Sequence, residues 1–218
     1  MSEAAPGFPD REQFATPQRS RLAEAVRRAI DVVMTVEDAT EDQMATAAAQ
    51  IEAATAVLAG PVAAGTDGLR RTSPNRNHGD YLPRSPIVGE SSPLAPPIAW
   101  EWVAPRIVGH VVFGAAYEGP PGYVHGGIIA LAFDEMLGMA NIASGHPGMT
   151  GTLTVRYRRP TPLYLEVDFE AWVVRFEGRR IATRGTLSVD DVVCAECDGL
   201  FIQPRPGLAA QYFGHPFG

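Results

Sequence analysis

The spacing of apolar residues predicts two helices at the start of the chain. In residues 16–37, apolar positions recur every three or four residues, which is typical of an amphipathic helix. A second segment begins at Thr40, three residues before Gln43 in a capping-box pattern, and ends at Gly60-Pro61. We expect residues 1–60 to form a helical hairpin that packs on the rest of the protein, with one apolar stripe per helix. The stripe on the first helix comprises Leu22, Val26, Ala29, Ile30 and Val33.

The next segment, residues 61–96, is rich in Pro, Gly and Ser. This composition is typical of irregular structure. We interpret the segment as a linker or as a wrap over the surface of the domain that follows.

Residues 97–205 show a pattern that predicts one long helix among antiparallel strands. A strand over 106–117 leads into an apolar helix, and four further strand-like runs follow it. Turn signals at Phe176-Glu177-Gly178 and Asp190-Asp191 separate the last three runs. This order predicts an α+β domain whose sheet curls around the helix, followed by a C-terminal tail, residues 206–218. The four runs cover residues 150–160, 163–174, 179–189 and 192–203.

The composition is that of an ordinary globular protein, with 45% hydrophobic and 20% charged residues and a net charge of −7. Proteins bind nucleic acid by neutralising its phosphates, so an acidic chain argues against a nucleic-acid partner. The N-terminus shows no basic start followed by an apolar run. We therefore expect a cytoplasmic protein.

The apolar stretch 124–143 has nearly the length of a membrane span, but Asp134 and Glu135 lie near its centre. Charges in that position make spanning costly. We interpret the stretch as a buried helix and expect no membrane partner. The two carboxylates inside it then call for a functional explanation.

No motif in the sequence predicts a metal site or a cofactor. Cys194 and Cys197 form a C-x-x-C on a predicted strand, where residues three apart point to opposite faces, so we expect reduced packing residues. The chain lacks a G-x-S-x-G elbow and, because it has no lysine, a P-loop. No zinc spacing joins the scattered histidines His78, His110, His146 and His215.

Three features of residues 97–203 occur together in one known family. The first is PPGYVHGG, with Asp134 nine residues after its histidine; the others are MTGTLTVRYRRPTPL, from residue 149, and a hairpin containing EGRR. In these features the segment resembles hotdog-fold acyl-CoA thioesterases of the phenylacetate-pathway type and, more closely, of the carboxy-terminal-modulator-protein type. The resemblance implies a hotdog fold and hydrolysis of an acyl-CoA substrate without a cofactor. Residues 1–92 carry no such resemblance.

The resemblance also implies roles for individual residues. The Gly126 N–H would bind the oxyanion, Asp134 would act as nucleophile or general base, and Thr150 would orient the attacking water. The chemistry fits, because N–H groups at a helix start lack partners inside the helix and glycine lets a carbonyl approach closely. We expect His125 to fix the loop before the helix by hydrogen bonding, and Gly127 to contact the substrate.

Arginines cluster around the ends of the predicted strands, and this cluster comprises Arg156, Arg158, Arg159, Arg179 and Arg180. On the run from residue 150, Leu153, Val155 and Tyr157 share one face and Arg156 lies on the other. We expect Arg156 and Arg158 to meet the phosphates of coenzyme A. The alternative for any one of these arginines is a solvated strand end.

Two positions leave alternatives open. Phenylacetate-type members carry an Asn six residues before the histidine, where this chain has Gly119; the closer relatives also lack the Asn. Glu135 lies about 100° around the helix from Asp134, so the two carboxylates cannot face one point. We interpret Glu135 as an interface or surface residue. The minority alternative is that Glu135, and not Asp134, is the catalytic carboxylate.

The active site is expected to be shared between two chains. Asp134 follows Gly126 by eight residues, about 12 Å along one helix axis. It cannot reach a thioester carbon whose oxygen lies about 3 Å from the Gly126 N–H of the same chain. We therefore expect a homodimer, or a dimer of dimers (a homotetramer), with antiparallel helices and the active site at the dimer interface. The resemblance implies the same arrangement.

Two other functions compete with hydrolysis. The first is a non-catalytic acyl-CoA-binding or ligand-sensing protein on the same scaffold, with the N-terminal hairpin as its effector part. The second, a hotdog dehydratase, would need an Asp and His pair in a motif that the chain lacks. The acyl group stays open, as does the choice between coenzyme A and acyl carrier protein.

Overall fold

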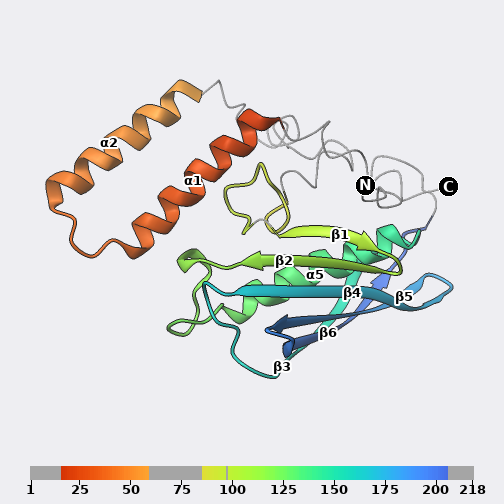
Figure 1. The fold of residues 1–218 in the computed structure, drawn as a ribbon. Helices are drawn as coiled ribbons and strands as arrows, with labels where there is room; N and C mark the ends of the chain where they lie inside the picture. Colours follow the sequence, from red (N-terminus) through yellow and green to blue (C-terminus); the bar gives the residue numbers. More distant parts are fainter. Residues whose placement is uncertain (1–15, 59–84, 97, 206–218) are drawn as a thin grey trace.

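The computed structural model describes residues 16–58, 85–96 and 98–205, and Figure 1 shows their arrangement. A six-stranded antiparallel sheet of order β1-β2-β4-β5-β6-β3 wraps around one central helix, α5. The expected α+β fold, a sheet around a long helix, is confirmed. The helical elements are α1 (Pro17–Thr35), α2 (Glu41–Leu58), the 3-10 turn η3 (Ala115–Tyr117) and α5 (Gly126–Ala143). The strands are β1 (Ala99–Val103), β2 (Arg106–Val112), β3 (Met149–Tyr157), β4 (Glu166–Glu177), β5 (Arg180–Val189) and β6 (Val192–Ile202).

Helix α5 forms the centre of the hydrophobic core. Its residues Phe133, Met136 and Leu137 are fully buried against the sheet. Within the described part of the chain, α5 is the one helix long and apolar enough to cross a membrane, and half of it is buried inside the fold. An apolar helix of this kind is also what a packed core requires.

Three glycines let the strands lie close to α5. A Cβ on Gly109 of β2 would lie 2.8 Å from Met136 Cε, and one on Gly185 of β5 would lie 3.2 Å from Leu137 Cδ2. A Cβ on Gly199 of β6 would lie 2.9 Å from Leu137 Cδ1. Side chains at these positions would push the sheet away from the helix, so the missing Cβ atoms allow the sheet to curl.

The strand predictions hold for β3 to β6, but the strand predicted over 106–117 ends at Val112, with η3 following it, and β1 was missed. This strand is short and lies at the edge of the sheet, and its alternating residues Trp100 and Trp102 are only half-buried. The Asp190-Asp191 turn is confirmed, with φ angles of 49° and 62°. The other turn lies later than predicted: β4 continues to Glu177, and Gly178 takes the left-handed conformation with a φ of 60°.

Residues 85–96, which the sequence pattern assigned to a linker or wrap, are tightly packed. Ile87 and Val88 belong to the hydrophobic core, and the Ser85 hydroxyl accepts hydrogen bonds from both of their N–H groups at 3.1 and 3.2 Å. This stretch therefore behaves as a wrap that contributes to the core. The rest of the expected linker, residues 61–84, lies outside the described residues.

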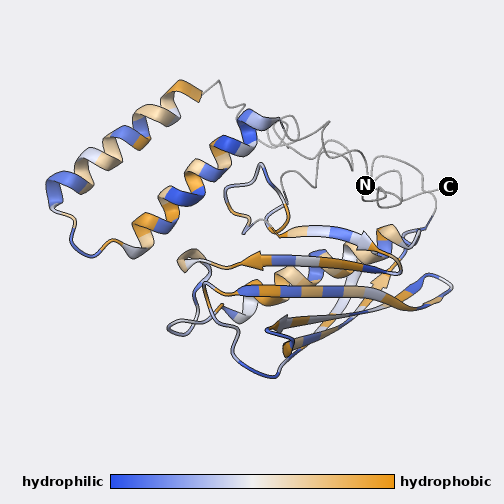
Figure 2. Cartoon of the chain, viewed as in Figure 1, coloured by the Kyte–Doolittle hydropathy of each residue, from blue (hydrophilic) through white to orange (hydrophobic). Residues whose placement is uncertain are grey.

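The two predicted N-terminal helices are present, and the capping box at Thr40 forms. The Thr40 N–H donates to Gln43 Oε1 at 2.8 Å, and the Gln43 N–H donates to Thr40 Oγ1 at 3.2 Å. The predicted packing face of α1 is only partly correct: Ala29 and Ile30 are half-buried, whereas Leu22 remains 47% exposed and Val33 65% exposed. Helix α2 buries no residue at all. Hydrophobic residues consequently lie exposed along both helices (Figure 2).

Candidate active site

The N-terminus of α5 presents one backbone N–H, that of Gly126, without a partner in the part of the chain that the structure describes. His125 is the N-cap: its Nδ1 accepts the Gly127 N–H at 2.9 Å, and its carbonyl accepts the N–H groups of Ile128 and Ile129. The Gly126 N–H donates to none of the described residues. A helix N-terminus favours negative charge, so this N–H can stabilise an anionic oxygen. His125 lies where a loop-fixing residue was expected.

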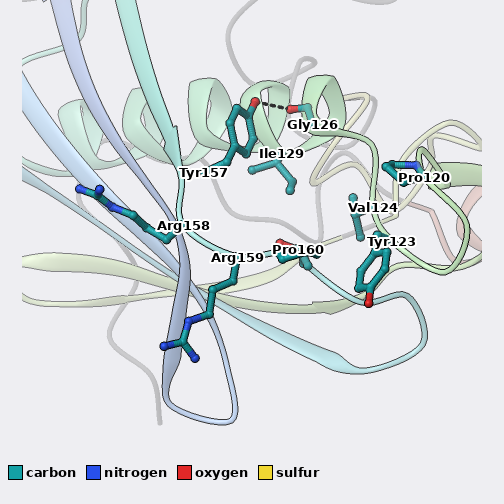
Figure 3. Close-up of a pocket in the computed structure, with 10 residues that line it drawn as sticks. Pro120, Tyr123, Val124, Gly126, Ile129, Tyr157, Arg158, Arg159 and Pro160 are labelled. Carbon is teal, nitrogen blue, oxygen red and sulfur yellow. Dashed lines mark hydrogen bonds between the residues drawn. The ribbon is translucent and has the colours of Figure 1, made fainter.

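Tyr157 of β3 binds the peptide that joins Gly126 to Gly127, the same peptide whose N–H donates to His125. Its hydroxyl donates to the Gly126 carbonyl at 2.7 Å (Figure 3). Burial raises the pKa of Tyr157, which keeps the hydroxyl protonated as a donor. A Cβ on Gly126 would meet the Tyr157 ring at 3.4 Å, an ordinary contact, so packing alone does not demand glycine there.

The structure of the loop before α5 explains why position 119 holds glycine and not the asparagine of the phenylacetate-type proteins. The His125 N–H donates to the Tyr117 carbonyl and the Gly119 N–H to the Tyr123 carbonyl, both at 2.9 Å. A Cβ on Gly119 would lie 2.7 Å from the Cα of His125. Because backbone atoms occupy that space, an Asn at position 119 would require the loop to move.

The second candidate group lies farther along α5. Asp134 is half-buried, and its Oδ1 accepts the Thr150 hydroxyl of β3 at 2.6 Å. The two residues predicted to act together are therefore in direct contact. Cys197 lies close by, and burial raises the pKa of its thiol to about 11, so it is protonated and inert at neutral pH. Glu135, the next residue, is half-buried as well.

A pocket of about 350 Å³ opens beside Gly126. Its walls are largely apolar and come from the loop before α5, the first turn of α5 and the end of β3 (Figure 3). Thr161 also lines it, and the Thr161 hydroxyl is buried with no hydrogen-bond partner among the described residues. Asp134 is not part of the lining. The other lining residues are Pro120, Tyr123, Val124, Gly126, Ile129, Tyr157, Arg158, Arg159 and Pro160.

The arginines expected to bind phosphate are already paired. Arg156 forms an ion pair with Asp198, which lowers the pKa of that carboxyl together with Arg184. Arg158 forms an ion pair with Glu196 at 2.8 Å.

Arg159 is the pocket-lining arginine that remains available. It forms no ion pair within the part of the chain that the structure describes, and its guanidinium extends away from the apolar part of the pocket (Figure 3). Its backbone position is set by the Cys194 carbonyl, which accepts the N–H groups of both Arg158 and Arg159 at 2.7 and 3.0 Å.

The histidines and cysteines considered as metal ligands do not come together in the described residues, and two other residues lie near Gly126 that the sequence pattern does not identify. Among the described residues, no group of three His, Cys, Asp or Glu side chains is arranged to hold a metal ion. Cys194 and Cys197 are free and buried. Nothing in the sequence points to Tyr157 beyond its place on a strand face, and nothing distinguishes Arg159 from the other arginines of its cluster. Their proximity to Gly126 depends on how β3 lies against α5.

Comparisons with known proteins agree on one family. Residues 121–196 match the family model described as the thioesterase superfamily. A solved structure of a thioesterase superfamily protein is 30% identical, covers 87% of this chain and 92% of its own, and superposes with a TM-score of 0.75.

Curated relatives match over a shorter region. Acyl-coenzyme A thioesterase THEM4 of Xenopus laevis is 36% identical over 95 residues, which are 43% of this chain and 43% of that protein. The Mus musculus protein of the same name is 35% identical over 95 residues, 43% of this chain and 41% of that protein. The match thus spans less than half the length of these relatives.

Proposed function

The chain belongs to the thioesterase superfamily, and from this premise we propose that it is an enzyme that hydrolyses acyl-CoA thioesters to a free carboxylic acid and coenzyme A. The observation that carries the proposal is the Gly126 N–H at the start of α5, which has no partner among the described residues and lies beside a largely apolar pocket of about 350 Å³. The names of the curated relatives support the same substrate class.

In this proposal, the Gly126 N–H stabilises the oxyanion. The thioester carbonyl oxygen lies in front of the α5 N-terminus, where the helix dipole and the free N–H both favour the negative charge that develops on it. Tyr157 and His125 hydrogen-bond the carbonyl and the N–H of the Gly126–Gly127 peptide, which directly follows the donor N–H. The donor is thereby positioned before the substrate arrives.

Asp134 supplies the negative group that starts the reaction. As general base it takes a proton from water, whose oxygen attacks the thioester carbon; as nucleophile its carboxylate attacks first and water cleaves the resulting anhydride. In both routes the carbon–sulfur bond breaks and the thiolate of coenzyme A leaves and is protonated. Thr150 donates to one carboxylate oxygen and leaves Oδ2 without a partner among the described residues, so Oδ2 can accept from water.

The two groups act together across a dimer interface. Within one chain, Gly126 and Asp134 are separated by about 12 Å of helix, and the pocket beside Gly126 does not include Asp134. Two α5 helices antiparallel across a two-fold axis bring each Gly126 to the partner chain's carboxylate. A homodimer is the smallest assembly with complete sites.

Arg159 binds a phosphate group of coenzyme A. It replaces Arg156 and Arg158 in this role because both of those side chains already pair with carboxylates on β6. A guanidinium matches phosphate geometry well, and Arg159 lies at the pocket that receives the thioester.

The proposal is tested by thiol release from a series of acyl-CoA substrates, including aromatic acyl groups. Asp134→Asn should abolish release, whereas the neighbouring Glu135→Gln serves as the matched control and should retain it. Tight binding of acyl-CoA without any thiol release would favour the non-catalytic binding or sensing function instead.

A further inference from the structure

Helix α1 contacts the domain through polar residues. Its apolar residues Leu22 and Val33 stay exposed, whereas Arg27 and Asp31 are half-buried against the body and Ala23 is fully buried. Ile30 is half-buried as well, but burial of the apolar stripe alone would also cover Leu22 and Val33. The hydrogen bonds of the polar residues therefore contribute to specifying how α1 docks.

Asp31 caps the short turn η3. Its Oδ1 accepts the Ala115 N–H at 3.2 Å, in a partly buried position. A Cβ on Gly114 would lie 2.9 Å from the same oxygen, so the glycine gives the carboxylate room to approach the backbone. Asp31 and Ala115 are 84 residues apart in the chain, so this contact ties the N-terminal hairpin directly to the domain.

Arg27 secures the neighbouring segment. Its Nη1 donates to the Ser92 carbonyl at 2.7 Å, and the Tyr117 hydroxyl donates to the Leu94 carbonyl at 3.2 Å. Burial raises the pKa of Tyr117 to about 12, while the positive charge of Arg27 opposes the rise. Residues of α1 and η3 thus hold the same stretch of backbone.

The turn η3 leads directly to the oxyanion donor. The Tyr117 carbonyl accepts the His125 N–H at 2.9 Å, and Glu118 pairs with Val124 in a short antiparallel bridge. The next peptide after His125 carries the Gly126 N–H. Oxyanion donors act only when held at about 2.7–3.1 Å from the reacting oxygen, so a shift of η3 would change the rate.

We infer that α1 is a positioning element for the active site, and that Arg27 and Asp31 hold the loop that presents the Gly126 N–H. This inference rests on the proposed hydrolase function. It gives the N-terminal hairpin a role in catalysis without any contact to the substrate. The path runs from Asp31 through η3 to the Tyr117–His125 hydrogen bond.

The test compares full-length variants in the same helix. Asp31→Ala and Arg27→Met each remove one contact, and Asp31→Asn keeps an oxygen that can accept the Ala115 N–H. Arg28→Met is the matched control, because Arg28 pairs with Glu24 on the exposed side of α1. We expect kcat to fall at least fivefold in Asp31→Ala and Arg27→Met with KM little changed. Asp31→Asn and Arg28→Met should stay within twofold of wild type.

Amide hydrogen exchange gives a readout that does not need activity. Exchange in residues 115–127 should speed up in Asp31→Ala and Arg27→Met and stay unchanged in Arg28→Met. Wild-type kcat with unchanged exchange in both test variants would overturn the inference, as would equal losses in the Arg28→Met control. If Asp31→Ala does not fold, Arg27→Met alone decides. A wild-type protein without hydrolysis would refute the proposed function, whereas the exchange result would still judge the positioning role.

Discussion

Mixing two inactive variants tests whether each site uses two chains. Gly126→Pro removes the oxyanion N–H at the first position of α5, where proline is well tolerated. His125, the residue before it, has φ −61° and ψ 131°, a conformation that a following proline accepts. Gly126→Ala keeps the N–H and, with a 3.4 Å contact to Tyr157, serves as the control for the fold. The second parent is Asp134→Asn.

The expected recovery follows from the geometry. If Gly126 of one chain works with Asp134 of the other, a mixed dimer holds one site with both lesions and one site with neither. Purified heterodimers should then show about half of wild-type activity, and random mixtures, in which about half of the dimers are mixed, about a quarter. If each chain carried a complete site, both sites of every dimer would stay damaged.

The assay uses two affinity tags on co-expressed chains, tandem purification of the heterodimer, and thiol release from the best acyl-CoA substrate. Melting temperatures of both parents should stay near that of the wild type, so that low activity reflects chemistry. Verified heterodimers that remain as inactive as their parents would refute the shared site. An active protein that is monomeric at assay concentration would refute it as well.

Three further predictions test individual residues. Asp134→Asn should lower kcat by roughly 10²–10⁴-fold, which is the usual contribution of a general base, while Glu135→Gln should change kcat less than twofold. Comparable losses of kcat in the two variants, measured with one acyl-CoA substrate, would contradict the assignment of Asp134 as the catalytic carboxylate. Thr150→Val removes the hydrogen bond to the Asp134 carboxylate, which is worth about 1.5–3 kcal/mol, so kcat should fall roughly 10- to 150-fold. Thr150→Ser keeps a hydroxyl and should retain most of the wild-type kcat. Arg159→Gln should raise KM for acyl-CoA by up to about fivefold, since an exposed ion pair contributes about 0.2–1 kcal/mol. The same variant should leave KM for an acyl-pantetheine substrate unchanged, and an equal rise for both substrates would exclude a phosphate contact.

The N-terminal hairpin shows which structural features a local sequence pattern predicts and which it does not. The capping box at Thr40 formed as predicted, because it involves residues three positions apart. The same pattern reasoning identified only part of the packing face of α1, since apolar spacing reveals a stripe but not what covers it. The contact of Asp31 with Ala115 helps to decide the face, and no local pattern contains it.

The candidate site likewise has features that follow from local sequence patterns and features that depend on the tertiary structure. The sequence by itself determined the helix with His125 and Gly126 at its start, the position of Asp134 along it and the strands that follow, because these depend on periodicity and capping within a few residues. Only the tertiary structure decided that Thr150 donates to Asp134 and that Tyr157 holds Gly126. It also decided that Arg158 pairs with Glu196, whereas Arg159 has no ion pair among the described residues. These contacts join residues 16, 31 and 38 positions apart. They exist because the sheet curls around α5, and the register between strands then sets which side chains meet.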